Sequence, residues 1–157
     1  MAGNNDASRL EGTMKRLMGT SNDVALTVLR VILGIVFFAH GAQLTLGWFG
    51  GYGFRATMGG FTHMGFPAPV AFLVICAQFL GALGLIFGAL TRIAAFGIAA
   101  VMTGAILMVH LPNGFFMNWM GTQKGEGFEF HLLALAMTVV LMLRGAGAWS
   151  VDRALAK

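Results

Sequence analysis

The chain has 157 residues, of which 57% are hydrophobic and 10% charged, and its formal net charge at pH 7 is +4. A water-soluble domain of this size could not bury so much apolar surface, because too few polar side chains remain to cover it. The composition therefore excludes an ordinary soluble enzyme and predicts a multi-pass membrane protein whose first partner is the lipid bilayer. Most basic residues flank apolar segments, so the positive charge indicates membrane orientation and no nucleic-acid partner is expected.

Residues 1–22 form a polar segment before the first apolar stretch. Leu10, Met14, Leu17 and Met18 recur at helical spacing between basic residues, which is typical of a short helix on the membrane surface. A disordered tail is an equal alternative, because glycines interrupt the pattern. The segment lacks the apolar stretch of a signal peptide, so we expect it to stay on the side of the membrane where it is made.

Three apolar segments follow, and each reaches the ~20 residues needed to cross the ~30 Å hydrocarbon layer as a helix. They are residues 24–46, 70–90 and 93–111. Residues 128–143 are a shorter fourth candidate, which spans only if Glu129 and His131 near its start lie at the interface or face other helices. We therefore predict an all-α integral membrane four-helix bundle, with residues 23–157 as one domain.

The basic residues are divided unevenly between the two ends of these segments. Only Arg55 and Lys124 fall in the first and third connections. Most of the others lie before the first segment, in the second connection or after the fourth segment: Arg9, Lys15, Arg16, Arg92, Arg144, Arg153 and Lys157. The positive-inside bias then predicts that both termini lie in the cytoplasm. The expected location is a bacterial-type cytoplasmic (inner) membrane.

The connections carry signals of the membrane interface. In residues 47–69, Phe54, Met58 and Phe61 recur at i, i+4 and i+7, which predicts a short half-buried helix at the outer interface. The third connection adds aromatic residues that are typical of the lipid headgroup level: Phe115, Phe116 and Trp119.

Small residues in the second apolar segment, including Gly84 and Gly88 four positions apart, are typical of close helix packing. We assign them to packing inside the protomer ahead of a homo-oligomer contact. The single cysteine, Cys76, excludes an intrachain disulfide and thioredoxin-like chemistry. No metal site is predicted, because the sequence contains no compact set of metal ligands.

Polar side chains gather toward the outer ends of the apolar segments. By the 1.5 Å rise per residue, His40 and Gln43 lie roughly 5–10 Å below the outer end of the first segment, and Gln78 lies roughly 12 Å into the second. His110 closes the third segment and Glu129 opens the fourth. Because an unpaired polar group in hydrocarbon costs several kcal/mol, we expect these five side chains to form one polar cluster in the outer half of the bundle.

Two interpretations of this cluster stay open. The side chains could serve only as hydrogen-bonding partners between helices, or they could form a functional site. Glu129 and His131, two residues apart, point about 200° away from one another, so only one can face inward. Glu129 is preferred, with His131 close behind. Arg30, in the inner third of the first segment, is interpreted as structural, either reaching the membrane surface or pairing with Asp152 or Asp23.

A family resemblance rests on seven stretches in this order: LRVILGIVFFAHGAQ, GWFGGYG, GFPAPVAFL, LGALGLIFGALTRIAA, VHLPNGFFMNW, EGFEFHLLALA and GAGAWSVDRAL. From about residue 24 to residue 153 the chain resembles the DoxX family of small four-helix membrane proteins. The resemblance implies an oxidoreductase component, since relatives are linked to quinone-coupled oxidation of sulfur compounds and to membrane complexes that handle thiol stress. The residues that fit the family pattern are Arg30, His40, Gly41, Gln43, Thr91, Arg92, His110, Gly114, Phe115, Phe116, Glu129 and Asp152.

Two positions depart from that pattern. Leu44 stands where members commonly have lysine, and Gln78 stands where they commonly have glutamate. Together the two replacements leave the net charge unchanged, as expected if the two groups form an ion pair in relatives. A mechanism that requires this ion pair is therefore in doubt for this chain.

The leading hypothesis is a quinone-linked membrane oxidoreductase subunit with no covalently bound cofactor. The chain has no nucleotide-binding domain and no redox cysteine pair, so this role needs a lipid-soluble carrier and a membrane or soluble redox partner protein. The expected ligand contacts are His40, Gln43 and Gln78 for hydrogen bonds to a quinone carbonyl, His110 and Glu129 for its protons, and Phe37, Phe115 and Trp119 for its ring.

The alternative hypothesis is a non-catalytic membrane module. Such a module would be a partner anchor, an assembly factor, or a binder or transporter of small molecules. Whether the chain is an enzyme therefore stays open at this point.

Overall fold

The computed structural model of the protein describes residues 12–14 and 17–156, and every regular element in this part of the chain is helical. The long helices are α2 (Val24–Thr45), α4 (Ala68–Phe87), α5 (Thr91–Ala105) and α6 (Glu129–Arg144). The shorter helices α3 (Gly53–His63) and α7 (Val151–Leu155) follow α2 and α6, and a 3-10 turn at Trp48–Gly50 leads into α3. The predicted all-α fold is confirmed, and α3 is the helix expected in the first connection.

The N-terminal surface helix was expected within residues 1–22. Residues 12–14 and 17–18 are helical, and most of the remaining pattern lies outside the described residues. The division into an N-terminal segment and one membrane domain therefore stays a prediction.

Three stretches of helix are long and apolar enough to cross a membrane: Val24–Thr45, Ala68–Phe87 and Thr91–Asn113. The third includes two irregular turns after α5, a π-helical turn at Ile106–His110 and a 3-10 turn at Leu111–Asn113. Helix α6 has 16 residues, about 24 Å at 1.5 Å per residue, which is shorter than the ~30 Å hydrocarbon layer. Helices able to span are thus confirmed for three of the four predicted segments.

Local chemistry explains where the long helices begin and end. An oxygen of the Asp23 carboxylate accepts hydrogen bonds from the main-chain N–H groups of Ala25 at 2.8 Å and Leu26 at 3.4 Å, which caps the start of α2. Pro67 precedes α4, where its missing N–H leaves no helical bond unmade. Gly88 ends α4 in the left-handed conformation, with φ of 67°.

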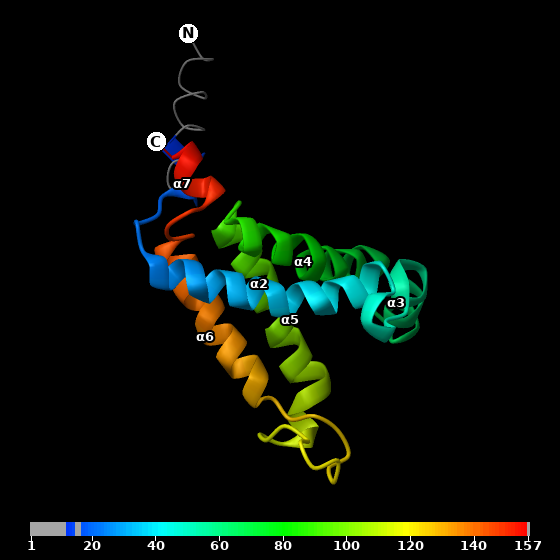
Figure 1. The fold of residues 1–157 in the computed structure, drawn as a ribbon. Helices are drawn as coiled ribbons and strands as arrows, with labels where there is room; N and C mark the ends of the chain where they lie inside the picture. Colours follow the sequence, from blue (N-terminus) through cyan, green and yellow to red (C-terminus); the bar gives the residue numbers. More distant parts are fainter. Residues whose placement is uncertain (1–11, 15–16, 157) are drawn as a thin grey trace.

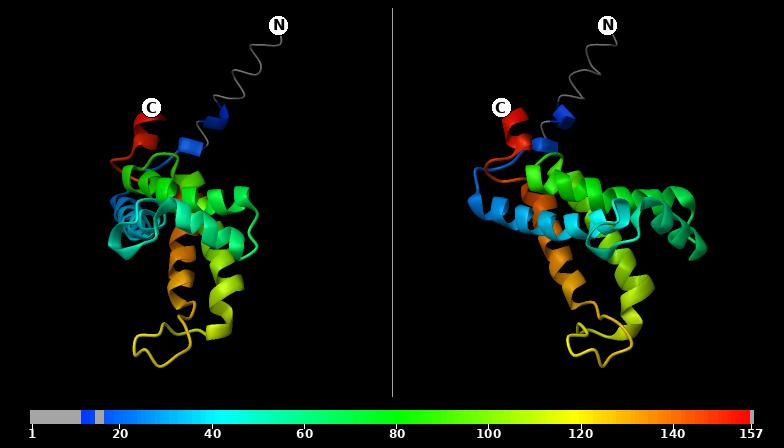
Figure 2. Two further views of the ribbon diagram at one scale, coloured as in Figure 1. Left: turned by 90° about the vertical axis from the view of Figure 1, so that its right-hand side faces the viewer. Right: turned by 45° about the vertical axis from the view of Figure 1, so that its right-hand side comes forward.

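The long helices form two antiparallel hairpins, α2 with α4 and α5 with α6 (Figure 1). Both hairpins start from the region beside α7 (Val151–Leu155) and diverge away from it, as the two views in Figure 2 also show. We call the region where they meet the junction: the start of α2, the turn between α4 and α5, and residues 145–152. One apolar core joins all four long helices near the junction, and its buried members are Leu33, Phe37, Ala82, Leu85, Ala95, Ile98, Met102, Ala134 and Leu141.

Beyond this core the helices present apolar side chains outward. Only 17% of the most apolar window in the third spanning stretch is buried inside the protein. Side chains such as Phe96, Leu107 and Leu133 are more than 60% exposed. A lipid environment accounts for this distribution, because exposed apolar faces of this extent are unfavourable in water.

Arg30 holds the junction together. Its side chain is 1% exposed, and all five N–H groups of the guanidinium are used. They donate to main-chain carbonyl oxygens at 2.6–3.3 Å, those of Leu85, Ile86, Ala146, Ala148 and Trp149. Arg30 therefore has a structural position, as predicted, but its hydrogen bonds go to carbonyl groups instead of a carboxylate.

Asp152 connects residues 145–152 of the junction to the start of α5. Its two carboxylate oxygens accept from the main-chain N–H groups of Leu90 at 2.7 Å and Thr91 at 2.9 Å, where α5 begins. Its own N–H donates to the carbonyl of Gly88 at 2.8 Å. A Cβ atom at Gly88 would lie 2.4 Å from Cβ of Ser150 and 3.0 Å from Cζ of Arg30, so only glycine fits there.

Close packing inside the α2–α4 hairpin depends on Gly41. A Cβ atom at this position would lie 2.6 Å from Cα of Phe79 and 2.7 Å from the carbonyl oxygen of Gln78, both main-chain atoms that cannot move alone. Gly84 also faces α5, where an added Cβ atom would lie 3.2 Å from Cβ of Ala94, whereas one at Gly81 would make only ordinary contacts with Ala94 and Ile98 at 3.6 Å or more. These small residues thus pack inside the protomer, as expected.

Replacing Gly41 with alanine is expected to lower the free energy of unfolding by about 1–3 kcal/mol, because the added methyl group forces the hairpin apart. The matched control is Gly104→Ala in α5, where an added Cβ meets nothing within 4 Å, and which should be neutral or stabilising by about 0.5–1 kcal/mol. Thermal unfolding in detergent measures both. Equal effects of the two substitutions would contradict the packing described here.

Candidate functional site

The polar site begins where the apolar core ends. Phe37 on α2 and Ala134 on α6 are both buried in the core. His40 lies three residues after Phe37, and His131 lies three residues before Ala134, so each histidine lies on the same helix face one turn further from the junction. The hairpins have begun to diverge at this level, and His40 is exposed between them. His131 remains buried, with 7% of its surface exposed.

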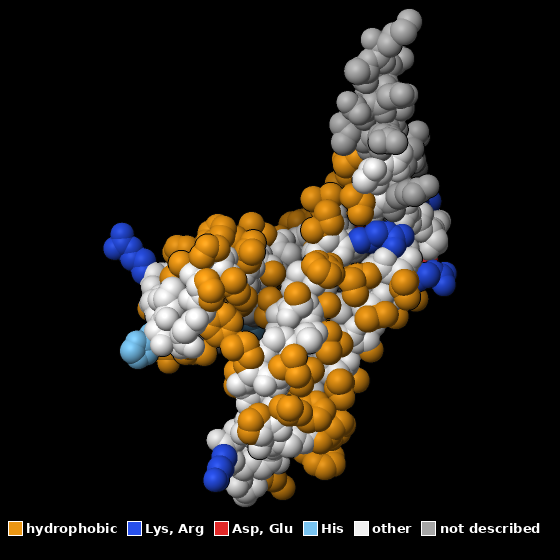
Figure 3. Space-filling view, turned by 180° about the vertical axis from the view of Figure 1, so that it is seen from behind, with side chains coloured by type: hydrophobic (Ala, Val, Ile, Leu, Met, Phe, Trp, Pro, Cys, Tyr) orange, Lys and Arg blue, Asp and Glu red, His pale blue; other side chains and the backbone are white. Residues whose placement is uncertain are grey.

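His110 joins this site from the end of the third spanning stretch. Its ring centroid lies 4.0 Å from that of His131, with the two planes tilted by 43°, and His40 lies within electrostatic range of His131. We call these three residues the histidine corner. Figure 3 shows the open angle between the two hairpins from behind.

A fixed hydrogen bond orients His110. Its Nδ1 lies 2.8 Å from the carbonyl oxygen of Glu126 in the third connection. A carbonyl oxygen can only accept, so Nδ1 carries the hydrogen and Nε2 is left to exchange a proton. The π-helical turn at Ile106–His110 sets this orientation, since it changes the residue-to-residue rotation just before the ring.

His131 has an unsatisfied nitrogen. Its Nδ1 atom is buried and has no hydrogen-bond partner. Most buried polar side-chain atoms in folded proteins have one, because an unpaired group costs about 1–3 kcal/mol. An orphaned imidazole nitrogen beside a second histidine marks the point at which an incoming polar group would be stabilised.

Glu129, expected in this cluster, points elsewhere. Its Oε1 accepts from the main-chain N–H of Met117 at 2.9 Å and from Nε1 of Trp119 at 3.4 Å, both in the third connection. The two residues His131 and Glu129 do lie on different faces of α6, as their spacing predicts, but it is His131 that faces the other helices. The preference for Glu129 as the inward residue is therefore not what the structure shows.

The two glutamines that were expected to contact a ligand, Gln43 and Gln78, have no hydrogen bond to the histidine corner. Gln43 follows His40 by one turn, but its Nε2 donates to the carbonyl of Phe49 at 3.2 Å and so holds the first connection. Gln78 lies on the buried stripe of α4, between Ile75 and Ala82, and is partly exposed.

The three aromatic residues expected around a ligand ring are dispersed. Phe37 is 1% exposed and packed into the core, with its ring centroid 6.3 Å from that of His40. Phe115 is 47% exposed and Trp119 is 84% exposed, and both lie on the third connection. The aromatic residues are thus divided between the core and the third connection.

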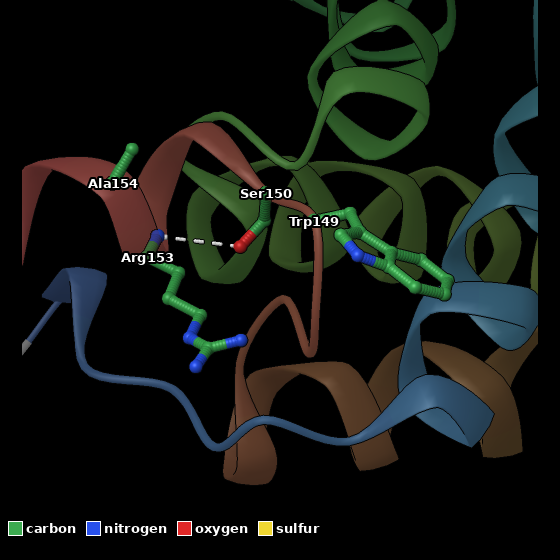
Figure 4. Close-up of a pocket in the computed structure, with 4 residues that line it drawn as sticks. All are labelled: Trp149, Ser150, Arg153 and Ala154. Carbon is green, nitrogen blue, oxygen red and sulfur yellow. Dashed lines mark hydrogen bonds between the residues drawn. The ribbon is translucent and has the colours of Figure 1, made fainter.

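In the described part of the chain, no group of three or more His, Cys, Asp or Glu side chains is placed to hold a metal ion. A hollow of about 220 Å³ lies beside α7, lined by Trp149, Ser150, Arg153 and Ala154 (Figure 4). The hydroxyl of Ser150 accepts from the N–H of Arg153 at 3.2 Å, which caps α7 and explains the polar wall of this hollow.

The family of the chain follows from its similarity to known proteins. The sequence profile of DoxX matches residues 25–111, which include His40, Gln78 and His110. The chain belongs to the DoxX family. A DoxX relative from Bacillus subtilis (strain 168), named "Putative oxidoreductase CatD", is 30% identical over 135 residues, which cover 86% of this chain and 90% of that protein.

Two further relatives span nearly the whole DoxX-type chain. The "Inner membrane protein YqjF" of Escherichia coli (strain K12) is 31% identical over 144 residues, covering 92% of this chain and 98% of that protein. The "Uncharacterized membrane protein Rv3486" of Mycobacterium tuberculosis is 29% identical over 157 residues, covering 90% of this chain and 88% of that protein. No solved structure matches the chain.

The sequence predicts that His110 and the start of the fourth segment lie in one cluster, but not that the ring of His131 packs against that of His110. The signal that was present is their place at the end of one apolar segment and the start of the next, joined by a single connection. A hairpin with its turn there brings the two positions together. The sequence carries no comparable signal for the π-helical turn at Ile106–His110.

Proposed function

We propose that this DoxX protein is a quinone-linked component of a membrane oxidoreductase and that its ligand site is the histidine corner. The observation that carries the proposal is the buried, unpartnered Nδ1 of His131 beside His110 in a membrane protein. The name of the Bacillus subtilis relative supports oxidoreductase chemistry. A quinone is soluble in the hydrocarbon layer and offers two oxygens to such polar groups.

A bound quinone or quinol would supply electron transfer coupled to the gain or loss of protons at its oxygens. The neutral imidazole of His131 can donate a hydrogen bond to a carbonyl oxygen or accept one from a hydroxyl group. His40, exposed in the angle between the hairpins, can hold a second polar atom. Gln78 on α4 would orient the ligand, and Phe37, which is buried in the core, would close the inner end of the site against water.

The proposal includes an orientation in the cytoplasmic membrane. The junction carries Arg92, Arg144 and Arg153, whereas Arg55 and Lys124 lie on the connections at the far ends of the hairpins. Figure 3 shows basic side chains near the junction and at each far end. The positive-inside bias places the junction and both termini on the cytoplasmic side, and the histidine corner then faces the outer half of the bilayer.

The electrons would pass to or from a separate redox protein in the membrane or in solution. This part of the proposal rests on the sequence, which has one cysteine and no dinucleotide-binding fingerprint. The role of the chain is then to hold the quinone and move its protons.

Titration of short-chain ubiquinone and menaquinone analogues into the protein in lipid nanodiscs tests the proposal. Saturable binding is expected, and His40→Ala should weaken it about tenfold, the loss of one hydrogen bond of about 1.4 kcal/mol. His63→Ala is the matched control, because His63 is exposed in α3 and lies outside the histidine corner. Absence of saturable binding, or the same affinity in both variants, would overturn the proposal.

A further inference from the structure

We propose that the hollow beside α7 binds the phosphate group of an anionic phospholipid from the leaflet next to the junction. Arg153 donates hydrogen bonds to the phosphate oxygens, and Trp149 packs against the glycerol and the first part of the acyl chains. This site lies at the junction, whereas the histidine corner lies further along the hairpins. The inference therefore goes beyond the proposed function and does not depend on it.

The hollow has the size and the walls of a small ligand site. Its volume is about 220 Å³, many times the roughly 10–15 Å³ that one water molecule requires. Figure 4 shows the side chains around it, which bring together a guanidinium, a hydroxyl group, an indole ring and a methyl group. None of these four residues is acidic, so the hollow suits an anion with an apolar part beside it.

The guanidinium of Arg153 has donors to spare. Within the described residues it has one hydrogen-bond acceptor, the uncharged Oδ1 of Asn22, although an arginine carries five N–H donors. The neighbouring carboxylate, that of Asp152, already accepts from the main-chain N–H groups of Leu90 and Thr91. Arginine is well suited to phosphate, because its planar set of N–H groups matches two phosphate oxygens at once.

The other polar groups in the wall are already used. The hydroxyl of Ser150 donates to the carbonyl oxygen of Gly147 at 3.0 Å and accepts from the N–H of Arg153 at 3.2 Å. The N–H of Asp152 donates to the carbonyl of Gly88 at 2.8 Å. These bonds fix the wall, and they leave the side chain of Arg153 as the donor that is available to a ligand.

The main chain holds Trp149 in an exposed position beside the hollow. Its φ is 47°, a left-handed conformation that is unfavourable for a residue with a Cβ atom. The carbonyl of Trp149 accepts from Arg30 at 2.8 Å, which fixes this conformation, and the side chain is 76% exposed. An exposed indole is typical of the headgroup level of a bilayer, where both its apolar ring and its N–H find partners.

The surroundings of the hollow place it at the membrane surface. The junction contains the start of α2 and the turn between α4 and α5, which are the ends of helices able to span a membrane. On α7, Val151 and Leu155 share one helix face and are both exposed. Apolar side chains next to a phosphate-binding group fit a phospholipid better than a free phosphate ion, which would leave them in water.

The charge of the junction selects among phospholipids. Arg92 and Arg144 lie at the junction together with Arg153, and three guanidinium groups disfavour the ammonium group of a zwitterionic headgroup. A basic residue near an anionic membrane surface strengthens binding about fivefold. We therefore expect phosphatidylglycerol to be preferred to phosphatidylcholine.

Quenching of tryptophan fluorescence by brominated lipids tests the site. The chain has three tryptophans, so the double substitution Trp48→Phe and Trp119→Phe leaves Trp149 as the only fluorescent indole. The protein is placed in phosphatidylcholine bilayers that contain either brominated phosphatidylglycerol or brominated phosphatidylcholine at the same mole fraction. The apparent affinity from quenching should be about fivefold higher for phosphatidylglycerol.

Two variants and one control locate the contact. Arg153→Gln should remove the preference for phosphatidylglycerol. Ala154→Glu should remove it as well, because it places a carboxylate in the hollow and leaves Arg153 in position. Ala154 is exposed, so this variant should unfold at the same temperature as the parent protein. Arg144→Gln is the matched control, since it removes the same charge from an exposed position at the junction, and it should keep the preference.

Equal quenching by the two lipids would overturn the inference. Equal losses in Arg153→Gln and Arg144→Gln would also overturn it, because general surface charge would then explain the preference. Inorganic phosphate should not displace phosphatidylglycerol more than sodium chloride of the same ionic strength does. Specific displacement by inorganic phosphate would show that the hollow prefers a free anion, and the lipid would be the wrong ligand. No sample contains quinone, so the result is independent of the proposed function.

Discussion

Replacing Arg30 with methionine is expected to lower the free energy of unfolding by about 3 kcal/mol or more. Methionine fills much of the same volume but leaves main-chain carbonyl groups at the junction without donors, and each unsatisfied buried acceptor costs about 1–3 kcal/mol. Arg30→Lys should have an intermediate effect, because an ammonium group has three donors for five acceptors. The sole cysteine, Cys76, is partly buried in α4, so reaction with a thiol-specific dye during heating reports unfolding.

The control for this prediction is Arg55→Met, which removes the same charge from an exposed position in α3. Its effect should stay within about 0.5 kcal/mol. A small effect of Arg30→Met, comparable with the control, would contradict the role of the five hydrogen bonds. A large effect of Arg30→Met with full rescue by lysine would show that charge alone, not the planar set of donors, stabilises the junction.

Replacing His131 with leucine is expected to stabilise the protein and remove ligand binding at the same time. Leucine removes a buried nitrogen that lacks a partner, which should raise the free energy of unfolding by about 1–3 kcal/mol. The same change removes the polar contact proposed for the quinone, so affinity should fall at least about tenfold. Opposite effects on stability and binding are typical of residues kept for function.

His63→Leu is the control, and it should leave both the unfolding temperature and the affinity nearly unchanged. A decrease in stability for His131→Leu would mean that the imidazole is already satisfied in the membrane, and the main argument for the site would be lost. An increase in stability with unchanged quinone affinity would instead place the ligand away from His131.

The sequence was sufficient for those parts of the fold that depend on local chemistry. Helix α2 begins at Val24 and ends at Thr45, within one residue of the predicted apolar segment, because Asp23 caps it and a glycine-rich turn follows. The short helix α3 was predicted from the spacing of three apolar side chains alone. The interpretation of Arg30 as structural also holds, since a buried guanidinium inside a membrane needs several acceptors nearby.

Other parts of the site depend on main-chain geometry that no side-chain pattern reveals. Helical spacing predicts that Glu129 and His131 face different ways. Which of them faces inward follows from the third connection, where the N–H groups of Met117 and Trp119 donate to the Glu129 carboxylate. The orientation of His110 likewise depends on a π-helical turn and on a carbonyl 16 residues away. Gln43 was expected to contact a ligand, but its side-chain amide donates to the carbonyl of Phe49 in the first connection.

The junction also constrains the order in which the protein can be completed during synthesis. Arg30 is separated by 116 residues from Ala146, one of its acceptors near the C-terminus. The first hairpin therefore enters the membrane before three of the five carbonyl groups exist. Until residues 146–149 leave the ribosome, this guanidinium lacks three of its five acceptors, so we expect truncation after residue 144 to leave the first helix incompletely inserted.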